Sequence, residues 1–227
     1  MFEYLKSKNL IKNSLEEEKL VKFLNLLKEW NKKFNLTSIK EDRDIEIKHF
    51  EDSLRGAEFF EKGKSVVEIG SGGGFPSIPL MIVREDLNFT LVESVGKKCE
   101  FLKFVINELN LNAKVLNKRA EDLGKDKFFR ESFDYVTARA VASLNTLCEY
   151  TLPLIKIGGK FIAYKSPNAE LANARNAIFL LGGKLESEHT YELSCGEGER
   201  VIYVIEKVKN TPPAYPRGNG KERSKPL

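Results

Sequence analysis

Cysteine, histidine and long apolar runs are scarce in this sequence. The 227 residues include three cysteines and two histidines, and no Cys/His spacing typical of a zinc site occurs. No apolar run approaches the roughly 20 residues that a membrane span needs. The start, MFEYLKSKNL, contains no apolar signal core. These absences predict a cytoplasmic protein with reduced thiols and with neither a metal nor a membrane partner.

The net positive charge lies at the carboxyl end of the chain. The formal net charge is +4, and residues 209–227 account for all of it. This segment contains one acid, Glu222, and the cations Lys209, Arg217, Lys221, Arg223 and Lys225. A basic end that is rich in proline and glycine favours a polyanionic partner. A solvated tail that only aids solubility is the alternative.

The chain divides into three regions. Residues 1–60 are predicted to be a helical extension, because Ser14 and Glu17 form a capping-box pattern and apolar residues at helical spacing follow. Residues 61–208 alternate between strand and helix patterns and form the main domain. Residues 209–227 are too polar and too rich in proline and glycine to predict a packed element.

The middle region predicts a Rossmann-like α/β fold. Strands are expected at 65–69, 89–93, 113–117, 133–138, 160–164, 184–193 and 200–207. Helices are expected at 44–60, 76–85, 96–109, 144–154 and 168–181. A βαβαβ series indicates a doubly wound, mostly parallel sheet. The last two strands lack a helix-length spacer, so they should form an antiparallel hairpin at the edge of this seven-stranded sheet.

A glycine-rich turn follows the first strand. In a doubly wound sheet this turn lies at the carboxyl edge, where ligands bind, and Gly70 and Gly72 would let a ligand approach the backbone closely. Glu93 ends the second strand, where a carboxylate can bind ribose hydroxyls. Dinucleotides require a third small residue in the turn, but Phe75 stands there and Pro76 follows. The pattern therefore favours S-adenosylmethionine, with a nicotinamide dehydrogenase or a turn without a ligand as weaker alternatives.

Motifs along nearly the whole chain carry a resemblance to a known family. They are WNKKFNLTSI (30–39), KHFEDSL (48–54), VVEIGSGGGFPSIPLMI (66–82), TLVESVGKKCEFL (90–102), NKRAEDL (117–123), FDYVTARAVASL (133–144), GGKFIAYK (158–165) and PPAYPRGNGKERSKPL (212–227). The sequence resembles the bacterial 16S rRNA 7-methylguanosine methyltransferases, also called glucose-inhibited division protein B. The resemblance implies a Rossmann-like methyltransferase fold, S-adenosylmethionine as methyl donor, S-adenosylhomocysteine as product, and N7 of one guanine in small-subunit rRNA as acceptor.

The resemblance also implies cofactor-binding residues. These are Gly70, Phe75, Ala120, Glu121 and Arg139, to which the turn pattern adds Gly72 and Glu93. Two positions depart from the family: Ser77 stands where a glycine is common, and Gly218 stands where a lysine is common. Neither departure alters the cofactor turn.

The expected chemistry needs no general base, because guanine N7 has a lone pair and no proton at neutral pH. Positioning alone can lower such a barrier by about 7–11 kcal/mol. His49 is therefore expected to be structural or to face the substrate rather than to act as a base. Arg139 is the candidate for a catalytic role that orients a carbonyl or phosphate oxygen of the substrate. A salt bridge at the sheet edge is the alternative role for Arg139.

The expected macromolecular partner is 16S rRNA, free or in a small subunit or assembly particle, and the chain is expected to be a monomer. Trp30 and Phe75 are expected to pack inside the protein rather than to stack on bases. The candidate RNA-binding residues are Lys32, Lys33, Asn35, Ser38, Lys40, Lys165, Arg200, Tyr215 and Arg217. The competing interpretations are a methyltransferase acting on another substrate and a non-catalytic RNA-binding module.

Overall fold

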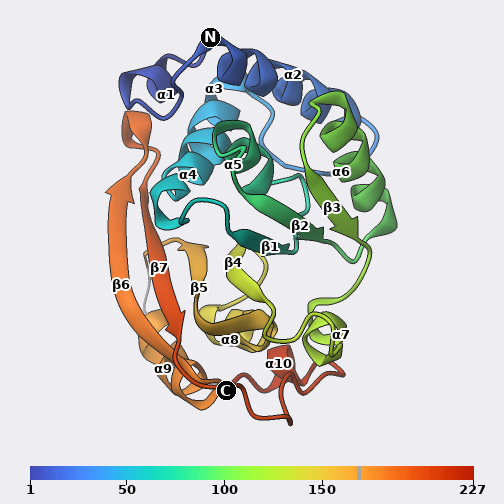
Figure 1. Ribbon diagram of the computed structural model, residues 1–227. Coiled ribbons are helices and arrows are strands. Elements are labelled where there is room, and N and C mark those ends of the chain that lie inside the picture. Colours follow the sequence, from blue (N-terminus) through green and yellow to red (C-terminus); the bar gives the residue numbers. More distant parts are fainter. Residues whose placement is uncertain (168–169) are drawn as a thin grey trace.

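The computed structural model describes residues 1–167 and 170–227, and the strands in these ranges form one sheet between two layers of helices (Figure 1). The strand order across the sheet is β3-β2-β1-β4-β5-β7-β6. The strands are β1 Ser65–Ile69, β2 Asn88–Val92, β3 Ala113–Leu116, β4 Phe133–Arg139, β5 Ile155–Lys165, β6 Gly183–Glu192 and β7 Glu199–Lys207. Strands β1 to β5 pair in parallel, and β7 is antiparallel to β5 and β6. The predicted seven-stranded α/β fold with an antiparallel edge is confirmed.

Strand β1 shows why the sheet is covered on both faces. Val66 packs in the hydrophobic cluster that includes the N-terminal helices, whereas Val67 and Ile69 pack in the cluster on the opposite face. Apolar residues pointing both ways are typical of a parallel strand between two helical layers. The strand order reverses beside β1, because β2 lies on one side of it and β4 on the other. Ligands bind at the carboxyl ends of the strands next to such a switch point.

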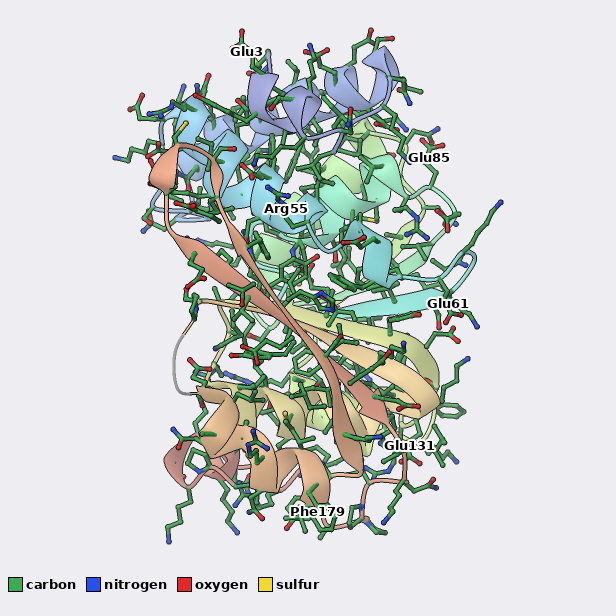
Figure 2. All side chains as sticks on the ribbon, turned by 90° about the vertical axis from the view of Figure 1, so that its left-hand side faces the viewer. Glu3, Arg55, Glu61, Glu85, Glu131 and Phe179 are labelled. Atoms are coloured by element: carbon green, nitrogen blue, oxygen red, sulfur yellow. The ribbon has the colours of Figure 1, made fainter. Side chains whose placement is uncertain are left out.

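The helices form one layer above the sheet and one below it in Figure 1. The upper layer contains α1 Glu3–Ser7, α2 Ser14–Asn31, α3 Asp42–Ile45, α4 Asp52–Leu54, α5 Ser77–Val83 and α6 Gly96–Glu108. The lower layer contains α7 Ala120–Lys125, α8 Leu144–Thr151, α9 Glu170–Leu180 and α10 Lys221–Ser224. In Figure 2, Glu3 and Phe179 mark the outer sides of these two layers. No helix in the described ranges combines the length and the apolar composition that crossing a membrane requires.

Helix α2 begins one residue earlier than the capping pattern predicts. Asn13 is the cap: its side chain accepts a hydrogen bond from the Glu16 amide at 2.9 Å, and Glu16 Oε2 accepts one from the Lys12 amide at 2.6 Å. Glu17 instead binds the Lys6 ammonium at 2.7 Å. Asparagine and serine are equally good N-cap residues, so the sequence pattern could not distinguish Asn13 from the adjacent Ser14.

The predicted helix at 44–60 is interrupted. Helix α3 continues into a π-helical turn over Glu46–Glu51, and α4 is followed by a 3-10 turn over Ala57–Phe59. Turns with the wider π geometry are frequent at functional sites, and this one carries His49. Two further 3-10 turns span Leu152–Leu154 and Ser194–Gly196. The predicted helix at 168–181 is described from Glu170 onward, and its first two positions lie outside the described residues. Helix α7 was not predicted.

The prediction that residues 209–227 would not pack is wrong. Thr211 is 3% exposed and Glu222 is fully buried. The Arg130 guanidinium donates hydrogen bonds to the backbone carbonyls of Thr211 and Tyr215 at 2.7 and 2.8 Å. Glu131, labelled in Figure 2, accepts a hydrogen bond from the Thr211 amide at 2.8 Å. The tail is ordered because its polar backbone finds charged partners on the main domain, which composition alone does not indicate.

Candidate functional site

The glycine turn after β1 depends on its lack of side chains. Gly70 has φ +71°, and a Cβ there would lie 2.5 Å from Val141 Cγ2. Gly72 has φ +51°, and its amide donates a hydrogen bond to Glu93 Oε2 at 2.9 Å. L side chains rarely adopt this left-handed conformation. The turn therefore holds its backbone against the ends of β2 and β4.

Glu93 joins the loops that follow β1 and β2. Its side chain is buried, and Oε1 accepts a hydrogen bond from the Val95 amide at 2.8 Å, in addition to the bond from Gly72. The Asn117 amide group donates to the Glu93 carbonyl at 2.9 Å, which ties in the loop after β3. The Ser94 hydroxyl also lies 3.5 Å from Oε1, whereas Oε2 accepts the bond from Gly72 and has a second lone pair that can accept a hydrogen bond from a ribose hydroxyl.

A narrow cleft of about 70 Å³ opens beside this turn. Its walls include the predicted residues Gly70, Ala120 and Glu121, which come from the ends of β1 and the start of α7. Apolar side chains of Ile69, Val92 and Val141 also line it, as do Tyr150 and Arg223, which the sequence did not indicate as site residues. The cleft thus has both apolar and polar walls, and Glu93 adjoins it through the next residue, Ser94, which also lines it.

Arg139 ends β4 and points into a dense polar cluster. One terminal nitrogen, NH1, donates to Asp52 Oδ2 at 2.7 Å and to the Lys48 carbonyl at 3.1 Å. The other, NH2, lies 3.0 Å from His49 Nδ1, and the guanidinium carbon lies 5.1 Å from the centre of the Phe75 ring. The salt bridge that was the alternative role for Arg139 is therefore present, and its partner is Asp52.

The cluster fixes the protonation state of His49. Arginine has no acceptor atom, so Arg139 donates and His49 Nδ1 accepts. Burial and the Arg139 charge lower the pKa of His49 to about 3. The neutral ring then carries its proton on Nε2, which lies 2.8 Å from Thr37 Oγ1 and can donate to it. This arrangement leaves His49 no free lone pair with which to act as a base.

A second cavity, of about 360 Å³, lies at the carboxyl ends of β4 and β5. Lys48, Asp52, Arg139, Lys165 and Arg200 line it together with His49 and Tyr164. Of the predicted RNA-binding residues, it thus brings together Lys165 and Arg200. The Lys165 ammonium is paired with Glu170 at 2.6 Å and donates to the Ala142 carbonyl at 2.9 Å.

The segment Arg139-Ala140-Val141 separates the two cavities. Ala140 lines the larger cavity, whereas Val141 lines the narrow cleft. Ala140 has φ +56°, a conformation that is uncommon for residues other than glycine and is often found at functional sites. The two cavities therefore meet at one short stretch of backbone beside the switch point of the sheet.

The other predicted residues lie in three places. Lys32, Lys33, Asn35, Ser38 and Lys40 are exposed in the segment after α2, from which Ile39 reaches the larger cavity. Phe75 is 7% exposed and packs on Phe23 and Phe50, and Trp30 packs on Phe34, Phe101 and Phe104. Both aromatic residues pack on other rings, as predicted. Phe75 and Arg139 are not among the residues that line the narrow cleft, so the cofactor contacts that the resemblance implies for them stay predictions.

Tyr215 and Arg217 are not near the larger cavity. The Arg217 guanidinium binds the buried carboxylate of Glu149 in α8, with N···O distances of 2.7 and 2.9 Å. Tyr215 packs in the hydrophobic cluster below the sheet. The Arg217 charge thus already balances an internal acid, and a contact of Tyr215 or Arg217 with RNA stays a prediction.

The strand order, the glycine turn and the acid at the end of β2 together define a Rossmann-like methyltransferase fold. A solved structure of this kind, M. jannaschii TYW2 in complex with AdoMet, is 16% identical in sequence and has a TM-score of 0.56. The alignment covers 75% of this chain and 80% of that chain. With 16% sequence identity, this similarity supports a shared fold and no shared function.

Sequence comparison identifies the family. A family model described as rRNA small subunit methyltransferase G, GidB, matches residues 16–200. The chain is 44% identical over 230 residues to ribosomal RNA small subunit methyltransferase G of Brevibacillus brevis, covering 99% of this chain and 97% of that protein. It is 43% identical over 219 residues to the protein of the same name from Clostridium perfringens, covering 93% and 92%. The chain belongs to the GidB family of rRNA small subunit methyltransferases, as its motifs predicted.

Proposed function

We propose that this chain transfers the methyl group of S-adenosylmethionine to N7 of a guanine in 16S rRNA. The observation that carries the proposal is the pair of cavities that meet at Arg139-Ala140-Val141. A methyl transfer needs a donor site and an acceptor site that share one boundary, so that donor, methyl and nucleophile can align.

The narrow cleft is the proposed donor site. Glu93 would accept hydrogen bonds from the ribose hydroxyls, and Ala120 and Glu121 would flank the adenine. Gly70 and Gly72 leave backbone space for the rest of the cofactor. When bound, the cofactor supplies a methyl group activated by the positive sulfur to which it is attached.

The larger cavity is the proposed acceptor site. Three of the five N–H groups of Arg139 are used within the protein, which leaves Nε and one hydrogen of NH2 for a guanine or phosphate oxygen. Its charge is balanced by Asp52, so the ion pair adds little net positive charge beside a base that becomes positive on methylation. Lys48, Lys165 and Arg200 also line this cavity. Lys48 is paired with Glu197 and Lys165 with Glu170, so Arg200 is the cation among these three that would chiefly attract the RNA backbone.

An rRNA substrate also implies further contacts outside the acceptor cavity. Exposed Lys32, Lys33 and Lys40 lie in the segment whose Ile39 lines the acceptor cavity, and they would contact phosphates. The chain would act as a monomer in the cytoplasm, on free 16S rRNA or on a small-subunit particle.

Transfer of radiolabelled methyl groups tests this proposal. The purified protein would be incubated with labelled S-adenosylmethionine and, in separate reactions, 16S rRNA, small subunits and protein extract from cells that lack the enzyme. Labelling of 16S rRNA or of the subunit RNA is expected. Labelling that appears only in protein or in small molecules would contradict the rRNA assignment.

A further inference from the structure

The carboxyl-terminal tail contributes a side chain to the proposed donor cleft. Arg223, from the short helix α10, lines the same cleft as Gly70 and Ala120. Its Nε lies 3.4 Å from the Tyr150 hydroxyl, and its NH2 lies 3.5 Å from the Val141 carbonyl. Both distances are at the limit of a hydrogen bond, so the exposed guanidinium is placed over the cleft without being tightly bound.

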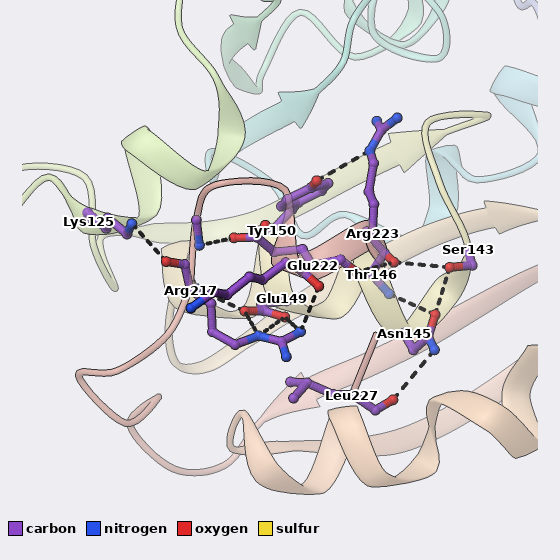
Figure 3. A network of polar contacts seen from close by, with 12 residues as sticks. Lys125, Ser143, Asn145, Thr146, Glu149, Tyr150, Arg217, Glu222, Arg223 and Leu227 are labelled. Atoms are coloured by element: carbon purple, nitrogen blue, oxygen red, sulfur yellow. Dashed lines mark hydrogen bonds and ion pairs between the residues drawn. The ribbon is translucent and has the colours of Figure 1, made fainter. Parts of the chain in front are cut away.

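Strong interactions fix the tail in this position, as Figure 3 shows. The Glu149 side chain is 1% exposed, and its carboxylate accepts hydrogen bonds from three nitrogen atoms of Arg217: the backbone amide, Nε and NH2. The Thr146 hydroxyl donates to the Glu222 carbonyl at 2.8 Å, and the buried Glu222 carboxylate accepts from the Gly218 amide. These anchors lie on both sides of the turn that leads into α10, and they set the position of Arg223.

The chemistry of the cleft indicates what Arg223 would bind. Ile69, Val92 and Val141 give the cleft apolar walls beside Tyr150, which is 5% exposed. The other polar residues that line the cleft are Ser94, Lys118, Arg119 and Glu121. Such walls suit one face and the edges of a purine. A guanidinium is planar, weakly hydrated and able to stack on a base, whereas a lysine ammonium is a strongly hydrated point charge.

We propose that the tail completes the cofactor site and that Arg223 binds the adenosyl group by stacking its guanidinium plane on the adenine. This inference rests on the proposed function, because it takes S-adenosylmethionine as the ligand. It assigns residues 211–227 to the donor site rather than to RNA contact alone. Arg217 and Glu149 are then positioning residues, since they act through the tail.

Calorimetric titration with S-adenosylhomocysteine tests this inference. The Arg223→Ala variant should bind about 3- to 30-fold more weakly than the parent, the range typical of a stacked cation. The affinity of Arg223→Lys should fall to a similar extent, because lysine keeps the positive charge but lacks the planar guanidinium group. Lys225→Ala, which removes the same charge from an exposed position in the same tail, should bind like the parent.

Unchanged affinity of Arg223→Ala would overturn the inference, and so would full recovery by Arg223→Lys. Loss of 16S rRNA affinity without loss of cofactor affinity in Arg223→Ala would overturn it as well, since Arg223 would then be a phosphate contact. The thermal unfolding midpoints of the variants should match the parent, because the side chain is exposed. If the parent itself binds no cofactor, the proposed function fails, which is a distinct result.

Discussion

Arg139 is a permanent cation at the boundary of the two cavities, and its charge is balanced before any substrate arrives. Asp52 pairs with it at 2.7 Å, and the neutral His49 accepts one of its N–H groups. The position of Arg139 at the end of a predicted strand made it a candidate from sequence. Its pairing with Asp52 could not be predicted, because the two residues are 87 positions apart and meet only through the fold.

Gly72 provides a direct test of the turn at the donor cleft. We expect Gly72→Asp to weaken S-adenosylhomocysteine binding by about tenfold or more, because a second carboxylate would lie beside Glu93. A Cβ alone would meet nothing closer than 3.7 Å, so Gly72→Ala should have a smaller effect. Calorimetric titration measures both. Equal affinities of Gly72→Asp and the parent would show that this turn does not bind the cofactor.

Glu68 predicts a pH dependence of stability. Burial raises the pKa of this carboxyl from 4.5 to about 7. The folded protein therefore binds more protons than the unfolded chain between these values, and the contribution of Glu68 to stability is lost as the pH rises from about 4.5 through about 7. Relative to the parent, Glu68→Gln should thus gain free energy of unfolding between pH 5 and pH 8.

Urea unfolding at the two pH values measures this gain. The exposed Glu58 is a matched control, and Glu58→Gln should keep the same difference from the parent at both values. A Glu68→Gln difference that does not change with pH would mean that the carboxyl is not shifted in the folded state.

At the scale of elements, regular strands were predictable and irregular segments were not. Strand β1 is an apolar run because it is buried on both faces, and that property is local in sequence. The ordered conformation of the tail could not be read from nearby residues. It depends on Arg130 and Glu149 in the main domain, which are far in sequence from the tail residues that they bind. The break at Glu46–Glu51 contains neither proline nor glycine, so its sequence did not indicate it.

The ion pair that anchors the tail should be worth more than a surface pair. Arg217→Ala should lower the free energy of unfolding by about 3 kcal/mol, because the buried Glu149 carboxylate loses its guanidinium partner and keeps only the hydrogen bond from the backbone amide of residue 217. Lys28→Ala removes a pair with Asp42 whose side chains are 43% and 48% exposed, and it should cost less than about 1 kcal/mol. Urea unfolding compares the two. Similar small losses in both variants would contradict an anchoring role for Arg217.

At the scale of the whole molecule, both cavities lie at one edge of the sheet. The segment after α2 reaches the same edge through Leu36, whose carbonyl lies beside Gly73, and through Ile39. The sequence predicted this edge from the glycine turn and strand order. It could not predict that the basic tail packs against α7 and α8 beside the donor cleft. Part of the positive charge at the carboxyl end thus stabilises the fold, as in the Arg217–Glu149 pair. The cations around the acceptor cavity and after α2 are the ones that would contact RNA.

Salt dependence tests that division of charge. The double variant Lys32→Ala, Lys33→Ala should bind 16S rRNA more weakly, and the slope of log affinity against log salt should fall in magnitude by about 2. Lys184→Ala with Lys209→Ala removes two exposed lysines at the opposite edge of the sheet and should leave the slope unchanged. Filter binding at several salt concentrations measures both. Equal slopes for the two variants would contradict an RNA surface after α2.

Mapping of N7-methylguanine in 16S rRNA tests the central claim most directly. RNA from cells that lack the enzyme would be treated with the protein and S-adenosylmethionine, and strand cleavage specific for N7-methylguanine would be read nucleotide by nucleotide. The account predicts new cleavage at one guanine in the treated RNA and, at a limiting concentration of S-adenosylmethionine, much weaker cleavage there with the Gly72→Asp variant. Methyl incorporation into the RNA without any N7-specific cleavage would contradict it.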